Sequence, residues 1–311
     1  MTTPDPTPAN ETRPQPRRLR RALFIGASIA AAMPLARAKP MIDLDRRALV
    51  ELENKSGGRL GVCILDTATG RHLGHRVDER FAMCSTFKMP LAAAILRQAD
   101  QGKLSLDTFV PYTEADMVFN APVTQANLAK GGMTIAALAE AAQKQSDNPA
   151  ANLLLKQLGG PQGLTQFFRD LGDDTTRIDR FEPGMNSVKP GDERDTTTPA
   201  AMAATAQKIL TGDVLKPASR DLLIQWMIDT KTGEKRIRAG LPKDWRAGDK
   251  TGTGYDEVSG KCNDIAIAWP PGNPPLIITA YYNTTGPADD IRDEDQAVLA
   301  EVGRIATAWI S

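Results

Sequence analysis

Histidine is almost absent from this 311-residue sequence. The two that occur, His72 and His75, lie close together in a segment with the pattern of a strand. A Ser-His-Asp triad would have to use one of them, and a catalytic zinc site usually takes two or three histidines. We interpret both as surface residues of the strand, and the sequence therefore favours chemistry without a metal.

The sequence also has only three cysteines and no formal net charge. The three cysteines, Cys63, Cys84 and Cys262, show no C-x-x-C spacing, which argues against a redox motif or a zinc knuckle. The 38 basic residues balance the 38 acidic ones, so no net charge draws the chain to nucleic acid or to an acidic membrane. With 41% hydrophobic residues, the composition is that of a folded protein with a sizeable core.

The N-terminal region has the pattern of an export signal. A polar, proline-rich leader ends in Arg-Arg-Leu-Arg-Arg at 17–21, and the apolar run at 22–35 follows. Fourteen residues are too few to span a bilayer comfortably, and Ala-Arg-Ala at 36–38 fits an A-x-A cleavage site. We expect residues 1–38 to be removed, leaving a periplasmic or secreted protein without a membrane anchor. The basic pair at 20–21 fits either a twin-arginine signal or an ordinary secretory signal.

Hydrophobic periodicity predicts strands at both ends of the mature chain and helices between them. We expect a hairpin at 60–65 and 71–77, and later strands at 249–255, 264–269 and 276–282. Helices are expected from residue 44 to about 56 and at 135–145, 149–158, 199–210 and 293–310, with a long loop at 173–198.

This order predicts an α+β fold with two lobes and a ligand cleft between them. The expected α/β lobe comprises residues 39–82 and 229–311. The expected all-α lobe comprises residues 83–228.

The stretch Ser85-Thr86-Phe87-Lys88 is the first candidate for chemistry. If Ser85 begins a helix, Lys88 lies on the same face within reach of its hydroxyl, and the free N–H groups of the first turn favour an anion. Alternatively, Ser85 is a helix N-cap and Lys88 is a solvated side chain.

Two further motifs follow in the chain, Ser146-Asp147-Asn148 and Lys250-Thr251-Gly252. The combination of S-x-x-K, S-D-N and K-T-G is a known signature of class A β-lactamases and penicillin-binding proteins. A second K-T-G at 231–233 joins a helical segment to the next element, and we regard it as coincidental.

Residues 41–311 as a whole resemble class A serine β-lactamases, most clearly at 59–62, 66–70, 146–155, 239–242 and 263–266. The resemblance implies a five-stranded antiparallel sheet flanked by the N- and C-terminal helices, beside an all-α lobe. It also implies a monomer that hydrolyses the β-lactam amide of small-molecule antibiotics, and so confers resistance, without metal or cofactor.

The resemblance also implies catalytic roles. Ser85 attacks the lactam carbonyl and forms an acyl-enzyme, and its proton leaves to Lys88 or through water. The backbone N–H groups of Ser85 and Thr253 form the oxyanion hole. Ser146 passes a proton to the departing lactam nitrogen.

Other residues are implied to bind the substrate. The K-T-G-T segment, comprising Lys250, Thr251, Gly252 and Thr253, would hold the substrate's carboxylate. Arg236 would assist it, or else is a solvated surface charge. Asn148 would bind the amide side chain of the drug, or else caps a helix or turn.

Glu182 separates a hydrolase from its relatives. A carboxylate at Glu182 and an amide at Asn186 can hold one water between them against the acyl-enzyme. A penicillin-binding transpeptidase of the same fold, or a non-catalytic β-lactam sensor, needs no such base. The loop resembles the family's in having Arg180 and Asp195 as a salt bridge across its neck, and its X-Pro bond at 182–183 is a candidate for the cis form.

Two features depart from the family pattern. Asn120 stands where the family usually has Tyr or Trp at the cleft wall, and Phe119 precedes it, so either the loop shifts by one residue or the wall is polar. Cys84 and Cys262 either form a disulfide or stay unpaired together with Cys63. Neither feature tells whether penicillins, cephalosporins or carbapenems are preferred.

Overall fold

The computed structural model describes the backbone of residues 41–310 and the side chains of residues 46–310. The predicted export signal at 1–38 therefore lies outside the described residues. Among the helices that the structure describes, none is long and apolar enough to cross a bilayer.

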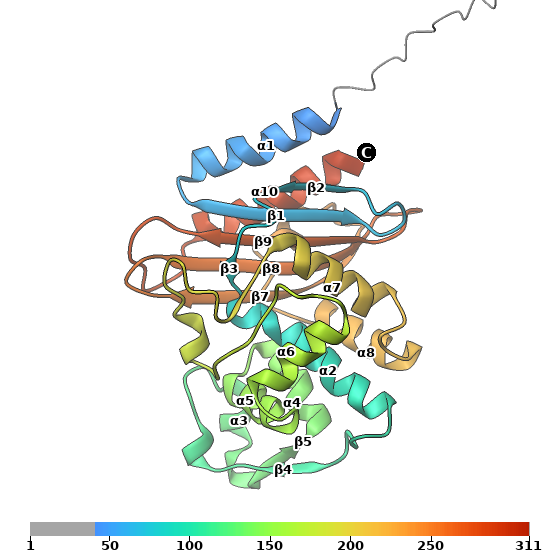
Figure 1. Ribbon diagram of the computed structural model, residues 1–311, viewed down its shortest axis with the longest axis vertical. Coiled ribbons are helices and arrows are strands. Elements are labelled where there is room, and N and C mark those ends of the chain that lie inside the picture. Colours follow the sequence, from blue (N-terminus) through green and yellow to red (C-terminus); the bar gives the residue numbers. More distant parts are fainter. Residues whose placement is uncertain (1–40, 311) are drawn as a thin grey trace, which may run out of the picture. The chain divides into compact units, whose positions relative to one another are not determined.

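A five-stranded antiparallel sheet forms the centre of the fold, as predicted (Figure 1). Its strand order is β2-β1-β9-β8-β7, so strands from the two ends of the sequence pair with each other through β1 and β9. The strands are β1 (Arg59–Asp66), β2 (His72–His75), β7 (Arg246–Tyr255), β8 (Gly260–Trp269) and β9 (Leu276–Asn283).

Helices cover both faces of this sheet (Figure 1). On one face lie α1 (Met41–Ser56) and α10 (Asp293–Ile310). On the other lie the helices between residues 88 and 228, namely α2 (Lys88–Asp100), α3 (Pro122–Ala126), α4 (Ile135–Gln145), α5 (Asn148–Gln157), α6 (Pro161–Asp170), α7 (Pro199–Thr211) and α8 (Pro217–Ile228).

Alternate side chains of β9 serve the two cores. Ile277 and Tyr281 pack with the central helices, whereas Ile278 and Tyr282 pack with the apolar side chains of α10. This alternation is the two-residue period of a strand buried on both faces. The helical insertion packs directly on the sheet through α7, which contacts β1 and β9. The lobe boundaries at 82/83 and 228/229 stay a prediction.

The remaining elements are short. The predicted long loop between α6 and α7 contains only one 3-10 turn, η4 (Gly184–Asn186), and a two-residue strand, β6 (Thr196–Thr197). The others are β3 (Phe81–Ala82), η1 (Cys84–Phe87), β4 (Phe109–Pro111), η2 (Glu114–Asp116), η3 (Leu128–Lys130), β5 (Gly132–Thr134) and α9 (Ile237–Gly240).

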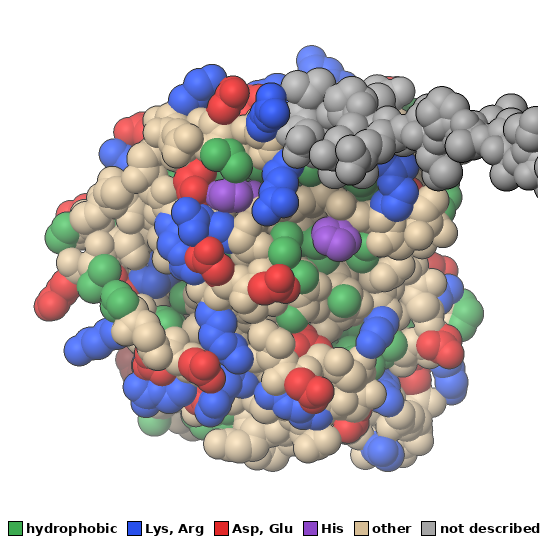
Figure 2. Space-filling model, turned by 45° about the horizontal axis from the view of Figure 1, so that its top comes forward, with side chains coloured by type: hydrophobic (Ala, Val, Ile, Leu, Met, Phe, Trp, Pro, Cys, Tyr) green, Lys and Arg blue, Asp and Glu red, His purple; other side chains and the backbone are tan. Residues whose placement is uncertain are grey.

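A buried carboxylate fastens α1 to the sheet. Glu53 accepts hydrogen bonds from Leu60 N at 2.8 Å and from Arg76 Nε at 2.7 Å, and His75 Nε2 lies 2.9 Å from its other oxygen. Burial by itself would raise the pKa of Glu53, but these hydrogen bonds outweigh it and lower the pKa to about 2. Both histidines reach the surface of the edge strand β2, as predicted, with His72 exposed and His75 half-buried (Figure 2).

We expect Glu53→Gln to lower the free energy of unfolding by about 2 kcal/mol at pH 7, because a charged acceptor of several hydrogen bonds is lost. A carboxylate whose folded pKa lies below its unfolded value of 4.5 stabilises the protein above pH 4.5, and that stability is lost as the pH falls toward 2. The difference between wild type and variant should therefore shrink to about half by pH 3. Urea denaturation at several pH values measures it.

Glu51→Gln is the matched control, since Glu51 is exposed on the same helix. It should change the unfolding free energy by less than about 0.5 kcal/mol. A Glu53→Gln penalty that is the same at pH 3 and pH 7 would contradict the assignment.

Candidate active site

Ser85 lies in the 3-10 turn η1, directly before α2. Its hydroxyl makes no helix-capping hydrogen bond, and the Lys88 side chain is fully buried, so the alternative of an N-cap followed by a solvated lysine is wrong. Lys88 Nζ donates to Ser85 Oγ at 2.8 Å. A Cβ at Gly252 of β7 would lie 2.6 Å from Met83 O, so glycine at this position lets the strand lie against the turn that carries Ser85.

Lys88 is surrounded by acceptors. Besides Ser85, its Nζ reaches Asn148 Oδ1 at 2.5 Å, Ser146 O at 2.9 Å and Glu182 Oε1 at 3.1 Å. Burial lowers the pKa of the Lys88 amine, and the Glu182 carboxylate offsets part of this effect. The amine is thus placed to exchange a proton with the Ser85 hydroxyl.

Ser146 stands between two buried amines. Its Oγ lies 3.3 Å from Lys88 Nζ and 3.2 Å from Lys250 Nζ. Burial, and after it the nearby charge of Lys88, places the pKa of Lys250 well below its usual range. Ser146 adopts the left-handed conformation at the end of α4, with a φ of 58°, which non-glycine residues seldom adopt. Such strain is typical of a functional site.

The other two residues of the S-D-N motif have different tasks. Asp147 caps α5 through Ala150 N at 2.9 Å and accepts further hydrogen bonds from the start of α3. Asn148 is buried, and its Nδ2 donates to Phe119 O at 2.8 Å. The cap is therefore Asp147, and the alternative reading of Asn148 as a cap is wrong.

Glu182 reaches the same place from the long loop. Its Oε1 lies 3.5 Å from Ser85 Oγ, and its Oε2 accepts from Asn186 Nδ2 at 2.5 Å. The Glu182-Pro183 peptide bond is cis. The Asn186 Oδ1 is buried and has no hydrogen-bond partner among the described residues, which leaves an acceptor beside the carboxylate.

Asn152 holds the backbone of Glu182 and was not predicted. Its Oδ1 accepts from Glu182 N at 2.8 Å, and its Nδ2 donates to Glu182 O at 2.9 Å. Asn152 lies four residues after Asn148 on α5, so both amides project from one helix face. That spacing was the available sequence signal.

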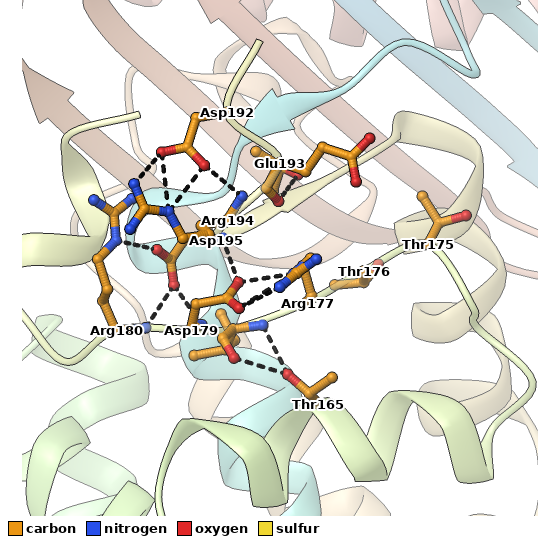
Figure 3. Close-up of polar contacts among 12 residues, drawn as sticks. Thr165, Thr175, Thr176, Arg177, Asp179, Arg180, Asp192, Glu193, Arg194 and Asp195 are labelled. Carbon is orange, nitrogen blue, oxygen red and sulfur yellow. Dashed lines mark hydrogen bonds and ion pairs between the residues drawn. The ribbon is translucent and has the colours of Figure 1, made fainter. Parts of the chain in front are cut away.

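The predicted salt bridge closes the neck of the loop (Figure 3). Arg180 Nε donates to Asp195 Oδ2 at 2.5 Å, and Asp195 Oδ1 accepts from the backbone N–H groups of Asp179 and Arg180 at 2.8 and 3.0 Å. A second carboxylate makes the reciprocal hydrogen bond: Asp179 accepts from Asp195 N at 3.2 Å, and it also pairs with Arg177. Sequence reasoning found the first pair and missed the second.

Arg236 is buried and faces the K-T-G-T strand, so its alternative reading as a solvated charge is wrong. It donates to Gly252 O at 2.9 Å and to Thr253 Oγ1 at 2.7 Å. In the second K-T-G the Lys231 side chain is 82% exposed, but Thr232 Oγ1 lies 2.7 Å from Thr251 Oγ1, so this copy lies beside the K-T-G-T strand and its interpretation as coincidental stays a prediction.

Two buried acids beneath this cluster were not predicted. Asp249 and Asp264 lie on the neighbouring strands β7 and β8, and burial raises the pKa of both. Arg238 pairs with Asp249 at 2.5 Å. Their signal in the sequence was a single acid within each of two strands of mostly buried residues.

The two departures from the family pattern are settled. Asn120 has a φ of 63° and its amide Nδ2 donates to Ser146 O at 2.7 Å, while Phe119 is 84% exposed. The wall residue is therefore polar. Cys63, Cys84 and Cys262 are all free and buried, so the alternative of a Cys84–Cys262 disulfide is wrong.

Comparisons with known proteins identify the family of the chain. The family model described as "Beta-lactamase enzyme family" matches residues 45–310. Beta-lactamase L2 of Stenotrophomonas maltophilia is 51% identical over 261 residues, which cover 83% of this chain and 84% of that protein. The carbapenem-hydrolyzing beta-lactamase KPC of Klebsiella oxytoca is 42% identical over 269 residues, with 86% and 90% covered.

Solved structures give the same result. An ancestral (GNCA) class A β-lactamase is 55% identical with a TM-score of 0.81, covering 85% of this chain and 99% of that one. A β-lactamase from Xanthomonas campestris is 47% identical with a TM-score of 0.82, covering 87% and 99%. The chain therefore belongs to the class A β-lactamases, the enzymes that hydrolyse β-lactam antibiotics.

Proposed function

We propose that this enzyme hydrolyses penicillins and cephalosporins through an acyl-enzyme on Ser85, which water activated by Glu182 then releases. The observation that carries the proposal is the convergence of Ser85, Lys88 and Glu182 in one buried cluster. A nucleophile, a lysine of lowered pKa and a carboxylate within hydrogen-bond reach are the groups that two-step acyl transfer requires.

Acylation begins at Ser85. Its Oγ attacks the lactam carbonyl carbon while its proton leaves to Lys88 or through water to Glu182. The oxygen that becomes negative is held by the N–H groups of Ser85 and Thr253, since β7 lies against η1. The C–N bond breaks as Ser146 donates its proton to the nitrogen, and the amines of Lys88 and Lys250 on either side can replace that proton.

Deacylation depends on the long loop. Glu182 removes a proton from a water molecule that attacks the ester carbon, the bond to Ser85 Oγ breaks, and the serine regains a proton. Asn186 supports this step, because its Oδ1 is an unused acceptor next to the carboxylate.

Substrate binding uses the cations of the cluster. The substrate's carboxylate fits against Lys250, Thr251 and Thr253, with Arg236 contributing its charge from behind Thr253. Asn148 binds the side-chain amide, since its Nδ2 carries a second proton besides the one donated to Phe119 O. The similarity to KPC makes carbapenems the third substrate class to measure.

The proposed location follows from the N-terminal pattern. With residues 1–38 as a removable signal, the enzyme acts in the periplasm or outside the cell, where β-lactams reach their targets. Mass spectrometry of the exported protein tests whether the mature chain starts near Lys39.

We expect Glu182→Gln to acylate but to release product about 10²–10⁴ times more slowly, because a general base contributes a factor of that size. Intact mass spectrometry after mixing with benzylpenicillin should show the protein plus one penicilloyl group. The control is Glu193→Gln on the same loop, whose side chain is 61% exposed and should retain turnover. Full turnover by Glu182→Gln would refute its role.

Ser85→Ala should prevent acylation altogether, since the nucleophilic oxygen is gone. The most sensitive test combines Ser85→Ala with Glu182→Gln in one protein. The Glu182→Gln variant alone accumulates the penicilloyl adduct, whereas the double variant should form none. If the double variant showed the same penicilloyl mass increase as Glu182→Gln, another residue would be the nucleophile.

A further inference from the structure

Among the described residues, the side chain of Asn120 makes one hydrogen bond, and it goes to a residue of the catalytic cluster. Asn120 Nδ2 donates to Ser146 O at 2.7 Å. Because the acceptor is a carbonyl, the nitrogen of the amide must point toward it. The left-handed backbone at Asn120, with a φ of 63°, aims the side chain there, and asparagine tolerates this conformation better than most residues.

The carbonyl of Ser146 is shared between two donors. Lys88 Nζ donates to the same oxygen at 2.9 Å, and a carbonyl oxygen has two lone pairs to accept both. Ser146 itself is in a left-handed conformation, which costs free energy unless neighbouring contacts fix it. Asn120 supplies one such contact, in addition to that of the buried lysine.

The backbone around Asn120 is tied to the same motif. Asn148 N donates to Asn120 O at 2.9 Å, and Asn148 Nδ2 donates to Phe119 O at 2.8 Å. Residues 119–120 and 146–148 therefore form one hydrogen-bonded unit. The Asn120 hydrogen bond to Ser146 is solvent-exposed, so its contribution to overall stability is small compared with its control of one peptide group.

We propose that Asn120 is a positioning residue for acylation. By holding the Ser146 carbonyl, it keeps the Ser146 hydroxyl between Lys88 and Lys250 and gives Lys88 a fixed acceptor. The proposal rests on the proposed function of Ser146 as the proton donor to the lactam nitrogen. In this proposal Asn120 acts by holding the Ser146 carbonyl through a hydrogen bond, and not by stacking against the drug.

The test is Asn120→Gly, which keeps the left-handed backbone and removes only the side chain. The acylation rate constant is measured by stopped flow with benzylpenicillin and with 6-aminopenicillanic acid, which lacks the acyl side chain. Loss of one hydrogen bond from the transition state should slow both substrates by the same factor, about five- to tenfold.

Two further variants test whether the effect is specific to the Asn120 hydrogen bond. Asn127→Gly is the matched control, because Asn127 Nδ2 also donates to a backbone carbonyl, that of Val123 at 2.9 Å, without contacting the cluster. It should leave acylation unchanged. Asn120→Asp places a negative charge one carbonyl away from Lys88, which favours the protonated amine and should move the acidic limb of the kcat/KM profile to higher pH.

The outcomes are distinguishable. Slower acylation of benzylpenicillin alone would show that Asn120 acts through the drug side chain, and unchanged rates with both substrates would show no role; either result overturns the proposal. If Asn120→Gly melts at a lower temperature, its slower acylation could come from lost stability, and the pH profile of Asn120→Asp then decides. An unshifted acidic limb in that variant would overturn the proposal. Absence of turnover in the unmodified enzyme would refute the proposed function itself.

Discussion

Two buried lysine amines on either side of one serine hydroxyl are the constraint on which the site depends. Lys88 and Lys250 have fully buried side chains, and an ammonium ion removed from water is costly unless it is neutralised or well hydrogen-bonded. The structure meets this cost with the Glu182 carboxylate and with carbonyl and amide oxygens around Lys88. The same burial lowers the pKa of both amines, so the groups that are expensive to bury are those that can exchange protons.

The loop between α6 and α7 must bring one carboxylate into this cluster without regular secondary structure. It is fixed at two points instead. At the neck, Asp179 and Asp195 each accept the backbone N–H of the other, and each pairs with an arginine of the same loop. Two residues beyond the neck, Asn152 of α5 holds both backbone polar groups of Glu182. Hydrogen bonds to backbone groups fix a loop's path, which side-chain packing alone would leave variable.

The sequence by itself determined the fold class, most elements and the candidate residues of the site. Hydrophobic periodicity placed the closing helix at its observed bounds, and the helix predicted at 135–145 is α4. Motif spacing identified Ser85, Lys88 and Ser146 as candidates, and the pairing of a carboxylate with an amide four residues later identified Glu182, because such signals depend on residue type at fixed positions in short stretches. Local patterns carry such information without knowledge of what packs against them.

Only the tertiary structure decided which alternatives hold. Whether Arg236 is solvated, whether Cys84 meets Cys262, and where the Asn120 amide points all depend on segments far apart in the sequence. The same is true of Glu53, whose partners at 60, 75 and 76 lie on or directly after strands that the helix contacts only after folding. A side chain's partner is set by the distance and angle between elements, and no pattern within one element encodes that geometry.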